Sequence, residues 1–249
     1  MHWLLGCAGD AAYLVEDPPA QNDLRSLLVL PISFDSTLAQ RYISTEMFDR
    51  GKKQLSKSLR EFLESSGHEV TLLRPTEVTL AWRDACNEAG LDFAEDDYSQ
   101  VEDRYESARA SLAQGLLEAH EADGVVMAGI FVREGRYVGQ HLRWDGVSRQ
   151  MRMEQKNNQA YVSSAMGGDI ATSIRVTIFD HAGRRVFERY AGIEPIMEYR
   201  YLGGEVMSYS TGSITRRNRT DLFQDDPLMQ HSIRVALMPL IVPPETRSK

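Results

Sequence analysis

Residues 26–32, SLLVLPI, form a continuous apolar run, which predicts a strand buried on both faces. Residues 47–66 follow with one apolar stripe at helical spacing, so an amphipathic helix is expected there, capped by Ser44 or Thr45. The stripe consists of Phe48, Leu55, Leu59, Phe62 and Leu63. Residues 68–73, HEVTLL, predict a second strand. Together the three segments indicate a β-α-β unit and therefore an α/β fold.

Two further helices and a third buried strand continue this pattern. Residues 75–89 and 98–122 predict the helices, and the second of them ends at Asp123-Gly124. Residues 125–132, VVMAGIFV, predict the third buried strand. Because strands joined through helices pair in parallel with right-handed crossovers, the first half is expected to be a parallel β-α-β-α-β arrangement.

The second half of the chain has a different pattern. Residues 133–136, REGR, predict a turn, and residues 137–144 predict a strand that pairs back on the third strand. In residues 170–178, Ile and Val alternate with Ser, Arg and Thr, which predicts a half-exposed strand. Residues 180–183, DHAG, predict a hairpin turn that leads into an antiparallel strand over residues 185–192.

A terminal helix completes the predicted order. Residues 227–240 carry Leu228, Ile233, Leu237 and Leu240 at helical spacing. We therefore expect residues 24–244 to form a single α/β domain of two or three layers, followed by a tail over residues 245–249. Its mixed sheet is expected to be parallel in the first half and antiparallel in the second.

Composition narrows the classes of function. The chain has 249 residues, of which 42% are hydrophobic, as expected for a packed core. The formal net charge of −8 argues against bulk binding to nucleic acid or anionic lipid, because both require a basic surface. The two cysteines, Cys7 and Cys86, leave a disulfide between them open; if Cys7 carries a lipid, Cys86 is a lone buried thiol.

The N-terminus resembles a bacterial lipobox, because residues 4–7, LLGC, end an apolar run with a small residue directly before Cys7. In a lipobox this thiol receives the lipid anchor. Only six residues precede Cys7, fewer than the roughly 7–15 apolar residues of a signal peptide. We therefore expect residues 1–6 to be the remnant of a signal peptide that begins upstream of Met1. The alternative is that Leu4, Leu5 and Cys7 belong to an apolar chain end or an edge strand.

Residues 7–23 predict a solvated, lipidated tether, because they are rich in acidic, amide and proline residues and show little periodicity. Ala8 stands where an aspartate would mark retention at the inner membrane. The resemblance therefore implies the periplasmic face of the outer membrane. No window approaches the roughly eighteen apolar residues of a membrane span, so membrane contact is expected only through the anchor.

Four segments resemble the TolB N-terminal-like fold. They are LLVLPI at residues 27–32, EVTLL at residues 69–73, ADGVVMAGI at residues 122–130 and IRVTIFDHAGRRVFERYAG at residues 174–192. In the last segment, the positions similar to those of many periplasmic lipoproteins are Asp180, Gly183 and Phe187. Envelope lipoproteins share this fold, among them the curli secretion channel subunit, the penicillin-binding-protein activator and the Pel export lipoprotein. The resemblance implies a non-enzymatic binding or assembly role and transfers no catalytic residue.

The sequence shows no motif for a catalytic, cofactor or metal site. Its six histidines lack HExxH or HxH spacing, and neither GxGxxG, GxxxxGK[ST] nor GxSxG occurs. We therefore expect no catalytic residue, no cofactor and no metal. Residues 95–97, EDD, are expected to be a solvated loop or helix start, with a glycosidase-type carboxylate pair as the alternative.

Two sets of residues are candidates for binding. Open α/β sheets bind ligands at the carboxyl ends of their strands, which for the first and third predicted strands points to Ser33, Asp35 and Arg133. The second set, at Arg216, Arg217 and Arg219, is basic and lies downstream of several tyrosines. It could contact a polyanionic glycan, lipid head groups or a partner protein, or it could be a solvated loop that balances nearby carboxylates.

Two hypotheses of function follow. In the first, the chain is a non-enzymatic envelope lipoprotein that binds another envelope protein or assembles with itself into a homo-oligomer. In the second, it is a cytosolic α/β small-molecule binder or enzyme with a site at the ends of strands 1 and 3. Upstream codons for a basic, apolar leader would favour the first.

Overall fold

The computed structural model describes residues 24–34, 41–91, 102–138, 141–150, 153–154, 168–202 and 213–241. Cys7, Asp35 and the predicted tether and acidic loop lie outside these ranges.

The first half of the chain is parallel, as predicted. Strand β1 (Ser26–Val29) pairs in parallel with β3 (Glu69–Leu72) on one side and with β4 (Gly124–Val138) on the other. The connections run through α2 (Thr45–Ser65), α3 (Pro75–Glu88) and α4 (Glu102–His120). The side chain of Ser44 caps α2 by accepting a hydrogen bond of 3.3 Å from the backbone N–H of Met47.

The predicted turn at residues 133–136 is wrong, because β4 continues through it to Val138. Over this length β4 pairs antiparallel with β8 (Gly168–Asp180), from Gly124 opposite Asp180 to Arg136 opposite Gly168. Gly135 is needed for packing instead of a turn, since a Cβ there would lie 2.7 Å from Cγ of Leu142. The antiparallel pairing with β8 therefore outweighs the local turn signal of REGR.

A tight hairpin follows β4. Strands β5 (His141–Trp144) and β6 (Val147–Gln150) are joined by Asp145 and Gly146, whose φ angles are 37° and 74°. Two successive positive φ angles are the signature of a type I′ turn, which matches the twist of the flanking strands. The hairpin lies against β9 (Arg185–Pro195), where the backbone N–H of Gly192 donates to the carbonyl of Asp145 at 3.0 Å.

The prediction that β8 is half-exposed is wrong for most of its length, because Ser173 and Thr177 are buried as well as the apolar side chains, and Arg175 is half-buried. Strand β8 lies between β4 and β9, so neither of its edges is free. Burial is tolerated because the polar groups have partners. Thr172 Oγ1 donates to the carbonyl of Glu194 at 3.0 Å, and Thr177 Oγ1 donates to Glu188 at 3.1 Å.

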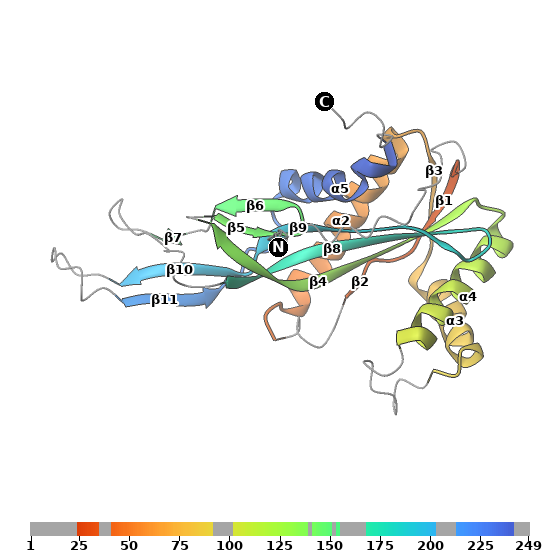
Figure 1. The fold of residues 1–249 in the computed structure, drawn as a ribbon, viewed down its shortest axis with the longest axis horizontal. Coiled ribbons are helices and arrows are strands. Elements are labelled where there is room, and N and C mark those ends of the chain that lie inside the picture. Colours follow the sequence, from red (N-terminus) through yellow and green to blue (C-terminus); the bar gives the residue numbers. More distant parts are fainter. Residues whose placement is uncertain are drawn as a thin grey trace, which may run out of the picture.

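The main sheet is the middle of three layers (Figure 1). One face packs against α2 and α5 (Asp226–Ile241) through an extensive apolar cluster that includes Leu59, Val126 and Ile178. The opposite face packs against α3 and α4 near the start of β4, through a second cluster that includes Val125 and Phe179. The alternation of side chains along the strands therefore separates two apolar layers.

The antiparallel end of the sheet matches the prediction. The turn over residues 180–183 connects β8 to β9, with Gly183 at a φ of 68°. Asp180 closes the turn by accepting from the backbone N–H groups of Ala182 and Arg184, each at 3.0 Å. The predicted terminal helix is also present, as α5.

A second, smaller sheet was not predicted. It contains β7 (Met153–Glu154), β10 (Met197–Leu202) and β11 (Ser213–Asn218), in the order β11-β10-β7. Figure 1 shows β10 and β11 extending beyond the main sheet, and we call this antiparallel pair the arm. Only Ile196 separates β9 from β10, so one extended segment passes from the main sheet into the arm.

Two further findings concern the described residues alone. None of their helices is long and apolar enough to span a membrane. Cys86 is a free thiol buried in α3, and burial raises the pKa of this thiol.

Candidate functional site

The two described members of the predicted ligand site share one face of the main sheet. Ser33 lies in the short strand β2 (Ser33–Phe34), opposite Gly129 of β4, and its hydroxyl donates to the carbonyl of Ala128 at 3.3 Å. Arg133 lies within β4, opposite Ala171, four residues beyond Gly129. Residues at even spacing on a strand share a face, so Ser33 and Arg133 are about 13 Å apart along it.

Two aromatic rings and a second arginine fill the space between them. The guanidinium of Arg175 lies 4.6 Å from the ring centroid of Phe131, and that of Arg133 lies 4.7 Å from the centroid of Tyr190. The two rings meet edge to face at 6.0 Å. This surface, made by Ser33, Phe131, Arg133, Arg175 and Tyr190, is called the open face below.

Gly129 has no side chain, and this leaves room on the open face beside Arg175, its partner in β8. Arg175 is paired with Gly129 on one side and with Tyr190 on the other. A Cβ at Gly129 would lie 2.8 Å from the hydroxyl oxygen of Ser33 and 2.9 Å from the ring of Phe131. The missing side chain therefore allows the neighbouring groups to approach the backbone closely.

Charged groups bound the open face at both ends. Toward the β5–β6 turn, Asp145 accepts from the Ser173 hydroxyl at 2.6 Å and pairs with Arg133 at 3.3 Å. Toward α4, Glu188 accepts from Thr177 and lies 3.4 Å from Arg185. These carboxylates are thus engaged by groups of the chain itself.

Arg175 is a permanent cation in this setting. Burial opposes its charge, but nearby Tyr190 and Glu188 outweigh burial, so the pKa of the guanidinium is raised. Sequence reasoning identified Ser33 and Arg133 but missed Phe131, Arg175 and Tyr190. The one signal in the sequence was Arg175 itself, a charged residue within the alternating pattern of residues 170–178.

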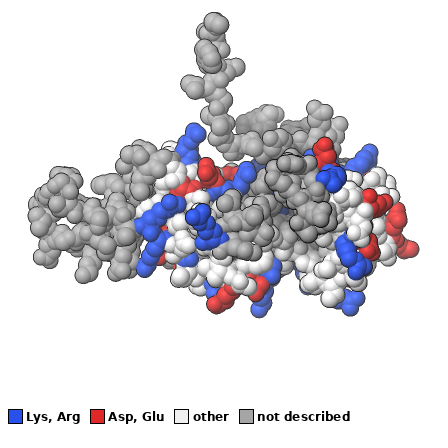
Figure 2. Space-filling model, turned by 90° about the horizontal axis from the view of Figure 1, so that it is seen from below, with Lys and Arg blue, Asp and Glu red and all other residues white. Residues whose placement is uncertain are grey.

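The three arginines of the predicted partner-binding set lie at the base of the arm, and each is paired with a carboxylate. Arg216 pairs with Asp169, Arg217 pairs with Glu198 at 2.6 Å, and Arg219 pairs with Glu194 at 2.8 Å. Arg216 and Arg217 remain about half exposed, whereas Arg219 is 12% exposed. On the face seen in Figure 2, the described acidic and basic side chains are likewise interspersed and do not gather into one basic patch.

One buried carboxylate, Asp169, joins the arm to the main sheet. Its side chain accepts from the hydroxyl of Tyr199 at 2.5 Å and from that of Tyr137 at 3.1 Å, and it also pairs with Arg216. Burial raises the pKa of both tyrosines, so their hydroxyls remain protonated donors. The cluster connects β4, β8, β10 and β11 through one side chain.

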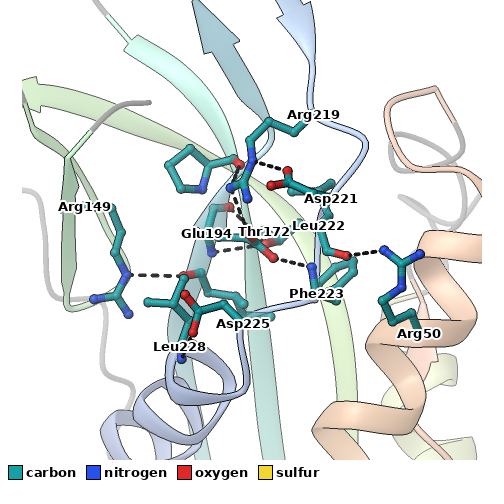
Figure 3. Close-up of polar contacts among 12 residues, drawn as sticks. Arg50, Arg149, Thr172, Glu194, Arg219, Asp221, Leu222, Phe223, Asp225 and Leu228 are labelled. Carbon is teal, nitrogen blue, oxygen red and sulfur yellow. Dashed lines mark hydrogen bonds and ion pairs between the residues drawn. The ribbon is translucent and has the colours of Figure 1, made fainter. Parts of the chain in front are cut away.

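A second buried carboxylate, Glu194 of β9, fixes the chain that follows the arm (Figure 3). It accepts from the backbone N–H of Phe223 at 2.5 Å and pairs with Arg219, which also pairs with Asp221 at 2.9 Å. Burial raises the pKa of Glu194, although Arg219 and the Phe223 N–H oppose this. The segment between β11 and α5 is thereby held against β9.

Among the described residues, no group of three or more His, Cys, Asp or Glu side chains is arranged to hold a metal ion. The predicted lipidation residue Cys7 and the predicted ligand residue Asp35 lie outside the described ranges.

Comparisons with known proteins find little similarity. No protein-family model matches the chain, and no curated protein matches it. Among solved structures, a PelC dodecamer from Paraburkholderia phytofirmans is similar at a TM-score of 0.36 and 9% identity, covering 90% of this chain and 94% of that one. This similarity is distant and does not support the TolB N-terminal-like family, which stays a prediction.

Proposed function

We propose that this chain is a non-enzymatic assembly component of the bacterial cell envelope, tethered through Cys7 to the periplasmic face of the outer membrane. The observation that carries the assembly role is the arm, a strand pair that extends beyond the main sheet (Figure 1). The anchor and the location are supported by the lipobox-like LLGC and the polar residues after it.

The arm has the properties of an assembly element. Its base is fixed by the buried Asp169 and Glu194 clusters, so its direction relative to the body is set before a partner binds. Among the described strands, none pairs with the outer edge of β11. A free strand edge can add a strand of another chain, and exposed edges are normally protected unless they are used.

The partner is another envelope protein or a second copy of this chain, and the arm carries the contact in either case. Arg217 is the best residue for a test, because its side chain is 52% exposed and lies on β11. Sedimentation velocity at several protein concentrations should show self-association that Arg217→Glu weakens. Arg74→Glu, at an 83% exposed arginine far from the arm, is the matched control and should have no effect.

A monomer at every concentration would point to a different protein as the partner. In that case crosslinking in envelope fractions should capture one protein with the wild-type chain and with Arg74→Glu, but not with Arg217→Glu. Capture that is equal for all three chains would contradict an assembly role for the arm.

The anchor is tested separately. The chain expressed from its genomic locus, with its upstream codons, should incorporate a palmitate analogue and fractionate with the outer membrane. Cys7→Ala should abolish the label. An unlabelled cytosolic product from the wild-type gene would exclude the anchor and favour the cytosolic alternative.

A further inference from the structure

Residues 219–223, called the clasp below, lie against the point where the main sheet continues into the arm (Figure 3). The backbone N–H of Arg219 donates to the carbonyl of Ile196 at 2.9 Å, and the backbone N–H of Phe223 donates to the side chain of Glu194 at 2.5 Å. Both strands of the arm meet the body here, since β10 directly follows Ile196 and β11 directly precedes Arg219. The clasp therefore fixes the base of the arm.

The clasp also packs against helix α2. Arg50 Nη1 donates to the carbonyl of Leu222 at 3.2 Å. The ring of Phe223 lies against Gly51, where a Cβ would be only 2.9 Å from the ring. Leu222 and Phe223 are fully buried and belong to the main apolar cluster. Adjacent residues of the clasp thus contact β9 on one side and α2 on the other.

Phe223 has a strained backbone conformation. Its φ angle is 63°, in the left-handed region that a bulky side chain rarely adopts. Such a conformation costs free energy and persists only where the surrounding contacts impose it. Here the contacts come from Glu194 on one side and from Arg50 and Gly51 on the other. Loss of the contacts on either side therefore favours relaxation of the whole clasp.

We infer that the clasp couples the arm to helix α2, so that the two change together. While the ring of Phe223 contacts Gly51, the clasp holds the base of the arm against β9. When the ring leaves Gly51, the backbone of Phe223 relaxes, its N–H leaves Glu194 and the base of the arm loosens. The coupling is reciprocal, so a partner that holds the arm also stabilises the contact of the ring with α2. This regulation of the arm rests on the proposed function for the partner alone.

Hydrogen exchange of the full chain, followed by mass spectrometry at a dilution where the chain is monomeric, tests the coupling. Gly51→Ala forces the Phe223 ring away from α2, whereas Gly115→Ala in α4 is the matched control, because nothing lies within 4 Å of a Cβ there. Both changes replace a helical glycine by alanine, so their effects on helix propensity are equal. We expect Gly51→Ala to speed exchange in β10 and β11 at least about ten-fold, with a smaller rise in β1, and Gly115→Ala to leave the arm unchanged.

A second matched pair lies on α2 itself. Arg50→Met and Arg60→Met each remove an ion pair with a glutamate four residues away, and Arg50 in addition donates to Leu222 of the clasp. Arg50→Met should therefore speed exchange in the arm about three-fold or more, whereas Arg60→Met should not change it. Because Arg50→Met leaves no new atom beside the Phe223 ring, it keeps the test decisive if Gly51→Ala fails to fold.

Two results would overturn the inference. One is unchanged exchange in the arm of either folded variant, Gly51→Ala or Arg50→Met. The other is an equal rise in the arm and in β1, which would show general destabilisation of the chain in place of coupling. Neither result bears on the Cys7 anchor or on the effect of Arg217→Glu on assembly. Failure of the coupling is therefore distinguishable from failure of the proposed function.

Discussion

Replacing Arg219 by methionine should cost more stability than replacing Glu194 by glutamine, although both changes break the same ion pair. The Glu194 side chain is fully buried, at 0% exposure, whereas Arg219 is 12% exposed. When Glu194 is neutralised, Arg219 keeps Asp221 at 2.9 Å as a partner. When Arg219 is removed, Glu194 keeps the backbone N–H of Phe223 as a hydrogen-bond donor, and Arg149 remains as a positive charge that does not form an ion pair with it.

The two losses differ in magnitude for this reason. An uncompensated buried charge costs about 3–5 kcal/mol, which we expect for Arg219→Met. Glu194→Gln keeps an oxygen that can accept from Phe223, so we expect a loss of about 1–3 kcal/mol. Urea unfolding followed by circular dichroism measures both values, with Arg74→Met as a surface control.

The pH dependence of the unfolding free energy is a second test of the Glu194–Arg219 ion pair. Burial already raises the pKa of Glu194, and loss of Arg219 should raise it further. Protonation removes this buried negative charge, so the deficit of Arg219→Met should shrink as the pH falls from neutral through the raised pKa of Glu194. The reasoning is refuted if Glu194→Gln costs as much as Arg219→Met, or if the deficit grows on acidification.

Three further changes test other parts of the fold. Gly192→Ala should destabilise the chain by about 1–3 kcal/mol, because its Cβ would lie 2.2 Å from Val147; an unchanged urea midpoint would show that the β5–β6 hairpin can move aside. Leu59→Ala should cost about 2–5 kcal/mol, since the side chain is fully buried in the main core, and a thermal melt within a degree of wild type would contradict this packing. Asp180→Asn should lower stability at neutral pH, because hydrogen bonds from Arg184 outweigh burial and lower the pKa of Asp180 below 3.8. The contribution of this carboxylate is present above pH 3.8 and lost as the pH falls through its folded pKa, so the deficit of Asp180→Asn should disappear in acid; a constant deficit would be inconsistent with it.

Local sequence patterns predicted the parallel half of the fold because its elements are defined by nearby residues. The stripe that includes Leu55 and Leu59 identifies α2, and both residues are fully buried. The apolar runs that predicted β1 and β4 likewise depend only on adjacent positions. The same reasoning failed at residues 133–136, where pairing with β8 outweighed the local turn signal; the partner residues lie 32 to 38 positions later in the chain.

Local patterns also predicted part of the candidate site, because some of its residues lie at the end of a strand that the sequence identifies. Ser33 follows a recognisable strand, so the sequence could place it at a sheet end. Phe131, Arg175 and Tyr190 come from three different strands and meet only because of the register between them. A register across strands is not encoded in the spacing of residues along any one of them.

The sequence by itself determined the α/β class, the order of most elements and the lipobox-like N-terminus, since each depends on composition or on periodicity within one segment. Only the tertiary structure decided that Ser173 and Thr177 of β8 are buried, that a second sheet exists, and that Asp169 and Glu194 hold it in place. These features depend on groups that are far apart in the chain and become neighbours only when the strands pair. The buried carboxylates Asp169 and Glu194 then stabilise this arrangement, because a charged group removed from water requires a partner within the fold.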